Sequence, residues 1–254
     1  MTPQHGRHAG LVRGGSGKRA RGIYEAGNLV SVEWRARLED HLGSFTCELL
    51  QPQAALYLDD SLRLAGLSSA CAVLEMALPE REPHPEVYES LFSFIANLSE
   101  DTWLEEYVKW ELELLAELGF GLDLTACAST GQSEELIYVS PKSGQAVSTN
   151  AGEPYKDKLL ALPEFLMHGL EGAPEIDFSA LYLGLNLTGY FMGRHVFIHH
   201  KNGEPPARTR LVDRVKQKHT ISSSKTVFYT GRLMNAPTIT SGDIRDTRLA
   251  DAIS

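Results

Sequence analysis

The chain begins with alternating apolar and polar positions, the two-residue period of a β-strand that buries one face. The clearest alternation places Val30, Val32, Trp34, Ala36 and Leu38 between Ser31, Glu33, Arg35 and Arg37. A second alternation at 45–49 follows turn residues at 41–43, so a hairpin is expected. The run 8–13 could supply a third strand, ahead of a glycine-rich loop at 14–19. These patterns predict a small β domain at the start of the chain.

From Asp59 onward the apolar positions repeat with the period of an α-helix. Asp59 or Asp60 is suited to cap a helix that ends before Pro79, with its buried stripe at Leu62, Ala65, Ser69, Val73 and Met76. Pro85 is suited to the first turn of a second helix. Thr102 and Glu105 have capping-box spacing before a third helix that Gly119 and Gly121 end. Its aromatic residues at 103–110 favour core packing over base stacking, because their spacing is helical.

The rest of the chain is less regular. Residues 123–158 are polar and turn-rich, apart from a short apolar run at 136–139. Helical patterns return at 159–168, at 178–195 and from Pro206, where Leu211, Val212 and Val215 are expected inside, and the pattern fades after Lys218. The predicted fold class is α+β. We expect a β domain over 1–55, an all-α domain over 56–218 with a polar insert near 123–158, and a disordered or non-native tail over 219–254.

The composition is that of an ordinary globular protein. The chain has 254 residues, of which 43% are hydrophobic and 22% charged. The apolar runs are shorter than the roughly 20 residues of a membrane span, and no apolar segment of a secretion signal follows Met1, so a cytoplasmic protein is expected. Cys47, Cys71 and Cys127 match neither a disulfide framework nor a metal knuckle, so free thiols are predicted.

The net charge of −9 conceals a segregation of charge along the chain. Residues 1–37 carry seven Lys and Arg against two acids, and residues 194–218 again carry seven against two. Residues 38–193 carry six bases against 26 acids. Because the local potential attracts phosphate, the two basic segments indicate contact with nucleic acid. In the alternative interpretation, the chain is a protein-interaction adaptor whose basic segments only form electrostatic contacts with its own acidic middle.

Motifs for catalysis or cofactor binding are weak. The glycine-rich loop has Val12 and Arg19 where a phosphate-binding loop needs Gly and Ser or Thr. His195, His199, His200 and Glu204 lack metal-ligand spacing and favour a surface cluster. No nucleophile, acid or base has a recognisable context, so neither an enzyme nor a metal or cofactor site is predicted.

The candidate DNA-binding residues are the cations of the two basic segments. In the β domain they are Arg7, Arg13, Lys18, Arg19, Arg21, Arg35 and Arg37. In the last helix they are Arg208, Arg210, Arg214, Lys216 and Lys218, of which Arg210, Arg214 and Lys218 are four residues apart on the expected exposed side. They are predicted to hold phosphates with little sequence preference.

Four blocks of the chain resemble one family. They are HGRHAGLVRGG at 5–15, PEREPHP at 79–85, LGFGLDL at 118–124 and YVSPKSG at 138–144. They resemble the bacterial RecO family of DNA repair proteins, in its alphaproteobacterial form, over residues 5–218. The resemblance implies an OB-fold, a helical C-terminal domain and no catalysis. It also implies binding of single- and double-stranded DNA and annealing of strands. Together with RecR, RecF and single-strand-binding protein, such a protein would load RecA at DNA gaps, and it would be associated with the nucleoid.

The chain departs from the family in three places. Members usually have two strands before the first block, so the OB-fold is expected to lack its first strands. Many relatives carry a four-cysteine zinc site, but here only Cys127 matches and Thr130 replaces the next cysteine, so zinc is not expected. Residues 234–254, and most clearly 243–254, resemble the first residues of the A subunit of topoisomerase IV, and our hypothesis is that the tail is read-through into a neighbouring gene.

Overall fold

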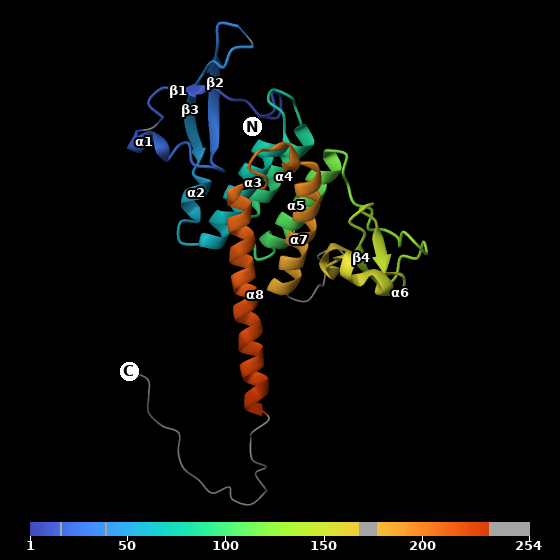
Figure 1. The fold of residues 1–254 in the computed structure, drawn as a ribbon. Helices are drawn as coiled ribbons and strands as arrows, with labels where there is room; N and C mark the ends of the chain where they lie inside the picture. The colour runs from blue at the N-terminus through green and yellow to red at the C-terminus, as the bar shows by residue number, and fades with distance from the viewer. Residues whose placement is uncertain (16, 39, 168–176, 234–254) are drawn as a thin grey trace, which may run out of the picture. The chain divides into compact units, whose positions relative to one another are not determined.

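The N-terminal part of the computed structural model is a three-stranded sheet (Figure 1). Its central strand β3 (Ser44–Gln51) pairs antiparallel with β2 (Leu29–Arg35) and parallel with the short β1 (Leu11–Val12). The helical turns α1 (Lys18–Arg21) and α2 (Gln53–Leu56) flank the hairpin in sequence. The predicted hairpin and third strand are thus confirmed.

The structure describes residues 1–15, 17–38, 40–167 and 177–233. The chain divides into two units, residues 1–219 and residues 220–254, and the packing described below lies within the first. Of the proposed read-through tail, residues 234–254, which carry the resemblance to topoisomerase IV, lie outside the described residues.

The apolar face of the first sheet is less covered than the alternation predicts. Trp34 is half-buried, but Val32 and Leu49 are exposed. Strand β2 ends at Arg35, so Ala36 and Leu38 fall in an exposed turn. Within the described residues β1 and β2 are both edges, so this is an open three-stranded sheet without the opposing strands that would bury its apolar face.

Three helices follow at the predicted places. Helix α3 (Ser61–Ala77) begins at the Asp60 carboxylate, which accepts hydrogen bonds from the N–H groups of Leu62 and Arg63, each at 3.0 Å. Helix α4 (Pro85–Ala96) has the proline in its first turn, and α5 (Trp103–Glu117) follows. The capping-box prediction is wrong, because the Thr102 hydroxyl donates to the Glu106 carboxylate instead.

The predicted stripe of helix α3 packs against the core, but the buried face of the helix is wider than predicted. Leu67, Ala70 and Leu74 are buried beside the predicted Ser69 and Val73. Gly66 belongs to this wider face, where a Cβ would lie 2.4 Å from the ring of Trp103, so glycine allows the close approach of α5. Helix α5 is the centre of the core, with its Trp and Tyr side chains buried as predicted.

The insert contains a second small sheet, so the C-terminal part is not purely helical. In the sheet, strand β4 (Leu136–Val139) lies between β5 (Ala146–Ser148) and β6 (Leu160–Ala161). Along the chain, the short turns α6 (Thr149–Gly152) and η1 (Glu153–Lys158) connect β5 to β6, and η2 (Glu164–Leu166) follows β6. The helix predicted over 159–168 is therefore wrong. Residues 160–161 pair with 138–139 and Pro163 follows, so the chain leaves helical geometry there.

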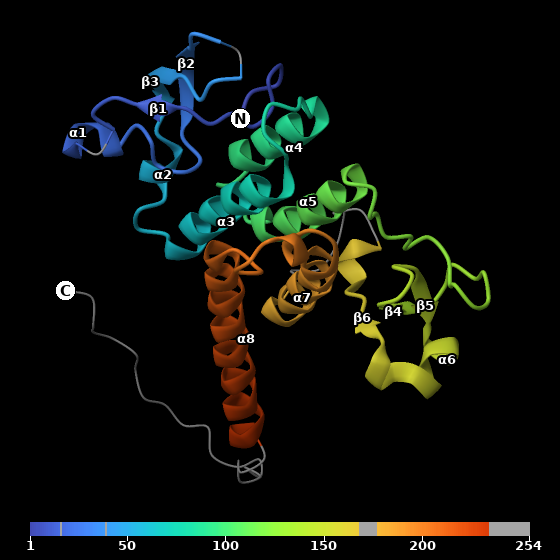
Figure 2. The ribbon, with the colours of Figure 1, turned by 45° about the horizontal axis from the view of Figure 1, so that its top comes forward.

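Two long helices complete the described chain (Figure 2). Helix α7 (Phe178–His195) packs against α5, and after the turn η3 (Phe197–His199) helix α8 begins at Pro206 as predicted. Leu211 and Val215 are buried, as expected. Helix α8 continues to Leu233, so 219–233 is helical although the apolar pattern fades after Lys218.

Candidate nucleic-acid interface

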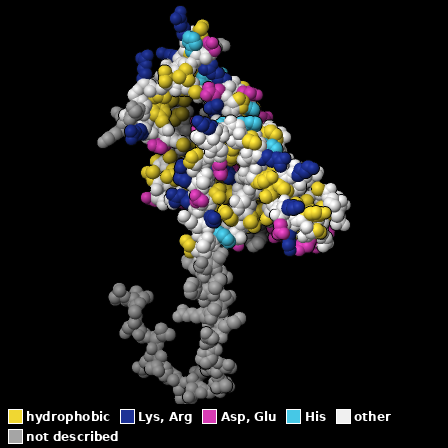
Figure 3. Space-filling view, viewed as in Figure 1, with side chains coloured by type: hydrophobic (Ala, Val, Ile, Leu, Met, Phe, Trp, Pro, Cys, Tyr) yellow, Lys and Arg dark blue, Asp and Glu magenta, His cyan; other side chains and the backbone are white. Residues whose placement is uncertain are grey.

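The structure places the cations of the N-terminal sheet in two groups. Lys18, Arg19 and Arg21 belong to α1, before the start of β2, whereas Arg35 and Arg37 lie at the other end of the hairpin (Figure 1). Figure 3 shows dark-blue Lys and Arg side chains around this part of the molecule. The described side chains of Arg13, Arg21, Arg35 and Arg37 are all exposed, so they can reach a ligand without a change of fold.

The partners of these cations differ. Within the described residues Arg13, Arg21 and Arg37 make no ion pair, whereas Arg35 pairs with Glu33, two residues away on the same face of β2, at 2.7 Å. Both partners are exposed to water, where such a pair is weak. A phosphate can therefore replace Glu33 at little cost, and the predicted role of Arg35 remains compatible with its position.

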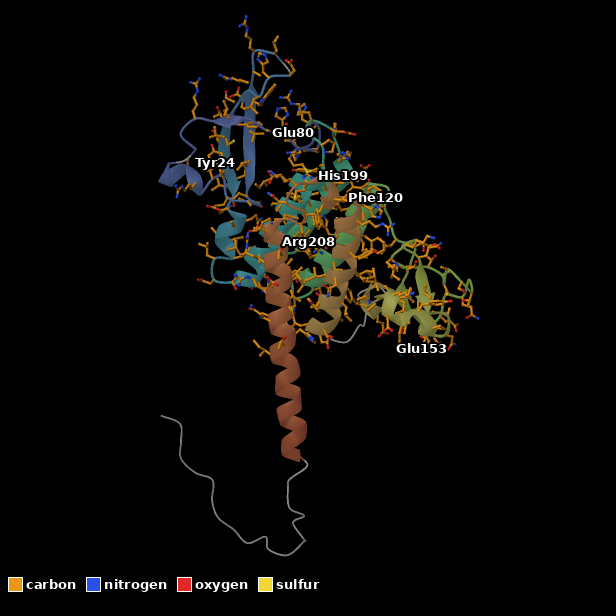
Figure 4. All side chains as sticks on the ribbon, viewed as in Figure 1. Tyr24, Glu80, Phe120, Glu153, His199 and Arg208 are labelled. Carbon is orange, nitrogen blue, oxygen red and sulfur yellow. The ribbon has the colours of Figure 1, made fainter. Side chains whose placement is uncertain are left out.

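Arg7 lies instead in a contact that joins the first sheet to the helices. Its guanidinium donates from Nε to the Leu78 carbonyl at 2.9 Å and pairs with Glu80 at 3.4 Å, and its own carbonyl accepts from the Arg81 N–H at 2.7 Å (Figure 4). Gly6 has φ +62°, and a Cβ there would overlap the Glu82 carbonyl. Residues 6–8 and 78–82, named the clasp below, therefore bring together two of the four family blocks.

Aromatic and cationic groups extend the clasp. Arg81 lies 5.8 Å from the ring centroid of Trp34 and donates to the His41 carbonyl at 2.6 Å. His8 packs edge-on against Trp34, with ring centroids 4.8 Å apart. Burial, and to a lesser extent the charge of Arg81, lowers the pKa of His8.

Arg208 is a correction to the predicted DNA-binding set. Only 2% of its side chain is exposed, and it forms a two-pronged ion pair with the fully buried Glu111, at 2.7 and 2.8 Å (Figure 4). Nη2 also donates to the Leu185 carbonyl, and Nη1 pairs with Glu204. Burial alone would lower the pKa of Arg208, but the Glu111 carboxylate raises it overall, so the guanidinium stays charged and cannot reach phosphate.

The acceptor of Arg208 is held by a buried polar network. Glu111 accepts from the Tyr107 hydroxyl at 2.8 Å and from the Thr188 hydroxyl at 2.5 Å, and Tyr107 shares a 2.7 Å hydrogen bond with Ser69. The network joins α3, α5, α7 and α8. One sequence feature could have revealed it, because Arg208 lies three residues before Leu211 and so shares the buried face of α8.

The other predicted cations of α8 are exposed: Arg210, Arg214, Lys216 and Lys218. Arg214 donates to the Ser61 hydroxyl at 2.9 Å, and the Lys218 ammonium lies 5.4 Å from the Phe178 ring centroid. These four residues are therefore surface cations on the helical part of the first unit, and they are far in sequence from the N-terminal sheet.

The residues of the insert do not fit zinc. The buried Cys127 sulfur accepts hydrogen bonds from the Ser148 N–H at 3.3 Å and hydroxyl at 3.4 Å, and the described residues contain no cluster of three or more His, Cys, Asp or Glu that could hold a metal. Although burial opposes ionisation, the hydrogen bonds from Ser148 lower the pKa of Cys127 to about 6. Hydrogen bonds thus take the place that a metal–sulfur bond would occupy.

The histidines near the end of α7 have separate partners. His195 stacks on Phe120, and His200 Nε2 lies 2.9 Å from the Met76 carbonyl, while Glu204 accepts from Arg208. They do not converge on one point. In the described part of the chain, each helix is also too short or too polar to cross a membrane.

Comparison with known proteins agrees with the four sequence blocks. The family model of the recombination protein O C terminal matches residues 58–204, which contain α3, α4, α5, the insert and α7. The chain belongs to the RecO family. Among its relatives, the DNA repair protein RecO of Rhodospirillum centenum is 50% identical over 224 residues, covering 87% of this chain and 88% of its own.

Other RecO proteins are similarly close. That of Rhodospirillum rubrum is 47% identical over 85% of this chain and 88% of its own, and that of Granulibacter bethesdensis is 50% identical over 85% and 86%. Membership of the RecO family gives the chain a role in recombinational DNA repair. It also confirms the α+β class, with a small sheet ahead of a helical part.

Proposed function

We propose that this RecO-family chain acts in repair by binding single- and double-stranded DNA without catalysis, by annealing strands and by helping to load recombinase at gaps. The observation that carries the proposal is the set of exposed arginines around the N-terminal hairpin, Arg13, Arg21, Arg35 and Arg37. Their segment has a charge of +5 in a chain of net charge −9, so phosphate is attracted locally.

Backbone neutralisation explains both the loose sequence preference and the annealing. Exposed arginines on a sheet and a turn contact phosphates rather than base edges, so affinity depends on charge and falls with salt. Two strands repel each other through their phosphates. A surface that neutralises both lowers that repulsion, and the exposed α8 cations Arg210, Arg214, Lys216 and Lys218 provide a second contact region.

The proposed partners beyond DNA are RecR, RecF, single-strand-binding protein and RecA. They rest on the family alone, and no residue of this chain is assigned to them.

The adaptor alternative predicts that the cations of the basic segments pair with acids of the acidic middle. The ion pairs of Arg7 with Glu80 and of Arg208 with Glu111 agree with that prediction. The exposed Arg13, Arg21 and Arg37 do not, since they make no ion pair with the described acids. The surface arginines therefore favour an outside partner.

A charge-reversal pair tests the proposal. Arg35→Glu/Arg37→Glu should weaken the binding of a labelled oligonucleotide, measured by fluorescence anisotropy, and should slow annealing of complementary strands. The matched control is Lys156→Glu/Lys158→Glu, the same charge change at exposed positions of the insert. Equal losses of affinity in the two double variants would show a general charge effect. An unchanged annealing rate in Arg35→Glu/Arg37→Glu would show that the hairpin is not part of the interface.

A further inference from the structure

An exposed aromatic stack lies where α5 and α7 end. Phe120 is 39% exposed, and its ring lies nearly parallel to that of His195, with centroids 4.4 Å apart and planes 14° apart (Figure 4). The buried Phe191 lies parallel to His195 from one turn earlier on α7. The solvent therefore meets a flat aromatic surface that is backed by the core.

The backbone fixes Phe120 in this position. Gly119 has φ +83°, its N–H donates to the Ala116 carbonyl at 2.9 Å, and the Phe120 N–H donates to the Leu115 carbonyl at 2.8 Å. These two bonds form a Schellman motif, in which the residue at the position of Phe120 usually packs back on its own helix. Here the Phe120 ring stacks on His195 of α7 and stays accessible. A ligand would therefore bind without the entropy cost of ordering this side chain.

One cation, Arg194, is held beside the stack, and a second, Lys142, follows the residue that holds it. Arg194, next to His195, is exposed, and its Nη1 donates to the Pro141 carbonyl at 2.8 Å, which holds the guanidinium in place. Lys142 follows Pro141 and is also exposed. Two acids, Glu117 and Asp123, each lie three residues from Phe120 in sequence, and the Asp123 carboxylate accepts hydrogen bonds from the N–H and hydroxyl of Thr125, at 3.1 and 2.6 Å.

Two family blocks build this surface. Phe120 belongs to block 118–124 and Lys142 to block 138–144, and the Asp123 N–H donates to the Gly144 carbonyl at 3.1 Å. Burial and the charge of Arg194 lower the pKa of His195, so its ring is uncharged near neutrality and stacks without repelling the two cations.

We propose that Phe120, His195, Arg194 and Lys142 form a second nucleic-acid site, specific for a single strand. An accessible ring with an arginine held beside its stacking partner and an exposed lysine in the adjoining block can stack an unpaired base and hold its phosphates. A duplex hides its base faces, so it would use the cations but not the ring. The site is separate from the hairpin surface. It rests on the proposed function only in that its ligand is taken to be DNA.

The experiment measures binding of fluorescein-labelled oligothymidylate to the full chain by anisotropy. It uses the Arg35→Glu/Arg37→Glu background, in which two of the proposed contacts of the hairpin are removed. Phe120→Leu keeps an apolar contact with His195 but removes the base-stacking ring. Loss of one stack should weaken binding by about fivefold or more. The control is Phe92→Leu on α4, an equally exposed ring that stacks on Tyr88, and it should leave affinity unchanged.

Crosslinking gives an independent result. Oligonucleotides with 5-iodouracil, irradiated on the parent chain, should label the peptide containing Phe120 or that containing His195. Melting temperatures of the Phe120→Leu and Phe92→Leu chains, read by circular dichroism, should match their background, which excludes a loss of fold.

Three results would overturn the inference. The first is equal oligonucleotide affinity of the Phe120→Leu chain and its background, and the second is an equal loss of affinity in Phe120→Leu and Phe92→Leu. The third is a Phe120→Leu chain that no longer binds a short acidic peptide but still binds the oligonucleotide as tightly as its background. Failure of the proposed hairpin surface gives a different result. In that case Arg35→Glu/Arg37→Glu would bind like the parent, while Phe120→Leu would still weaken binding.

Discussion

Removing Arg208 should destabilise the chain far more than its position among surface cations suggests. Arg208→Met preserves much of the side-chain volume but leaves the Glu111 carboxylate fully buried, with only the Tyr107 and Thr188 hydroxyls as donors. Breaking a buried ion pair on one side costs about 3–5 kcal/mol, because an uncompensated charge remains. For a folded unit of this size, that loss lowers the melting temperature by about 6–20 °C.

A double variant separates the cost of the orphaned charge from the cost of lost packing. Arg208→Met/Glu111→Leu leaves no unpaired charge in the network. Tyr107 keeps Ser69, and the Thr188 hydroxyl keeps the carbonyls of Gly184 and Leu185, at 3.2 and 3.3 Å. Since apolar replacements of buried ion pairs are often neutral or stabilising, the double variant should recover most of the loss.

The assay is urea unfolding followed by circular dichroism at helical wavelengths, with parent, both single variants and the double variant forming a cycle. Arg210→Met, two residues along α8 and exposed, is the control and should change stability by less than about 0.5 kcal/mol. A loss below about 1 kcal/mol for Arg208→Met, or a double variant no better than the worse single one, would refute the argument.

Three further predictions concern the clasp and the insert. Gly6→Ala should cost much more than Gly119→Ala in urea unfolding, because both have positive φ but only at Gly6 would the new Cβ overlap a backbone carbonyl; equal costs would count against the clasp. Because the folded chain lowers the pKa of Cys127 to about 6 from 9.0, its sulfur stabilises the fold fully above about pH 9 and loses that contribution as pH falls to 6. The melting-temperature gap between parent and Cys127→Ser should therefore widen from pH 6 to pH 9, and a constant gap would contradict the assignment. A chelator should leave the melting temperature of the parent unchanged, and a marked drop would mean that a metal supports the insert.

Local sequence features predicted most element boundaries. Asp60 and Pro85 set the starts of α3 and α4 because capping and proline geometry act within one turn. Helix α7 has the predicted bounds, and α8 begins at the predicted proline. These cases share short-range chemistry that needs no knowledge of the partner.

The errors come from contacts between distant residues. Strand β6 exists because 160–161 pair with 138–139, and an isolated helical pattern at 159–168 carries no information about that pairing. The wider buried face of α3 includes Gly66, whose contact with Trp103 likewise joins two separate helices. Arg208 has the local sequence context of a surface cation, because its acceptor, Glu111, lies 97 residues earlier in the chain.

The candidate site was predicted in part for the same reason. Exposed Arg35 could be identified from alternation in β2, which places it opposite the apolar face. The stack of Phe120 on His195 could not, because it joins the end of α5 to the end of α7.

The salt dependence of DNA binding tests the central claim most directly. Arg35→Gln/Arg37→Gln removes two proposed phosphate contacts without adding negative charge. If both arginines contact a single strand, the slope of log affinity against log salt should become shallower by about 1.4. A slope equal to that of the parent, or a parent affinity that does not fall with salt, would contradict binding of DNA through the hairpin arginines.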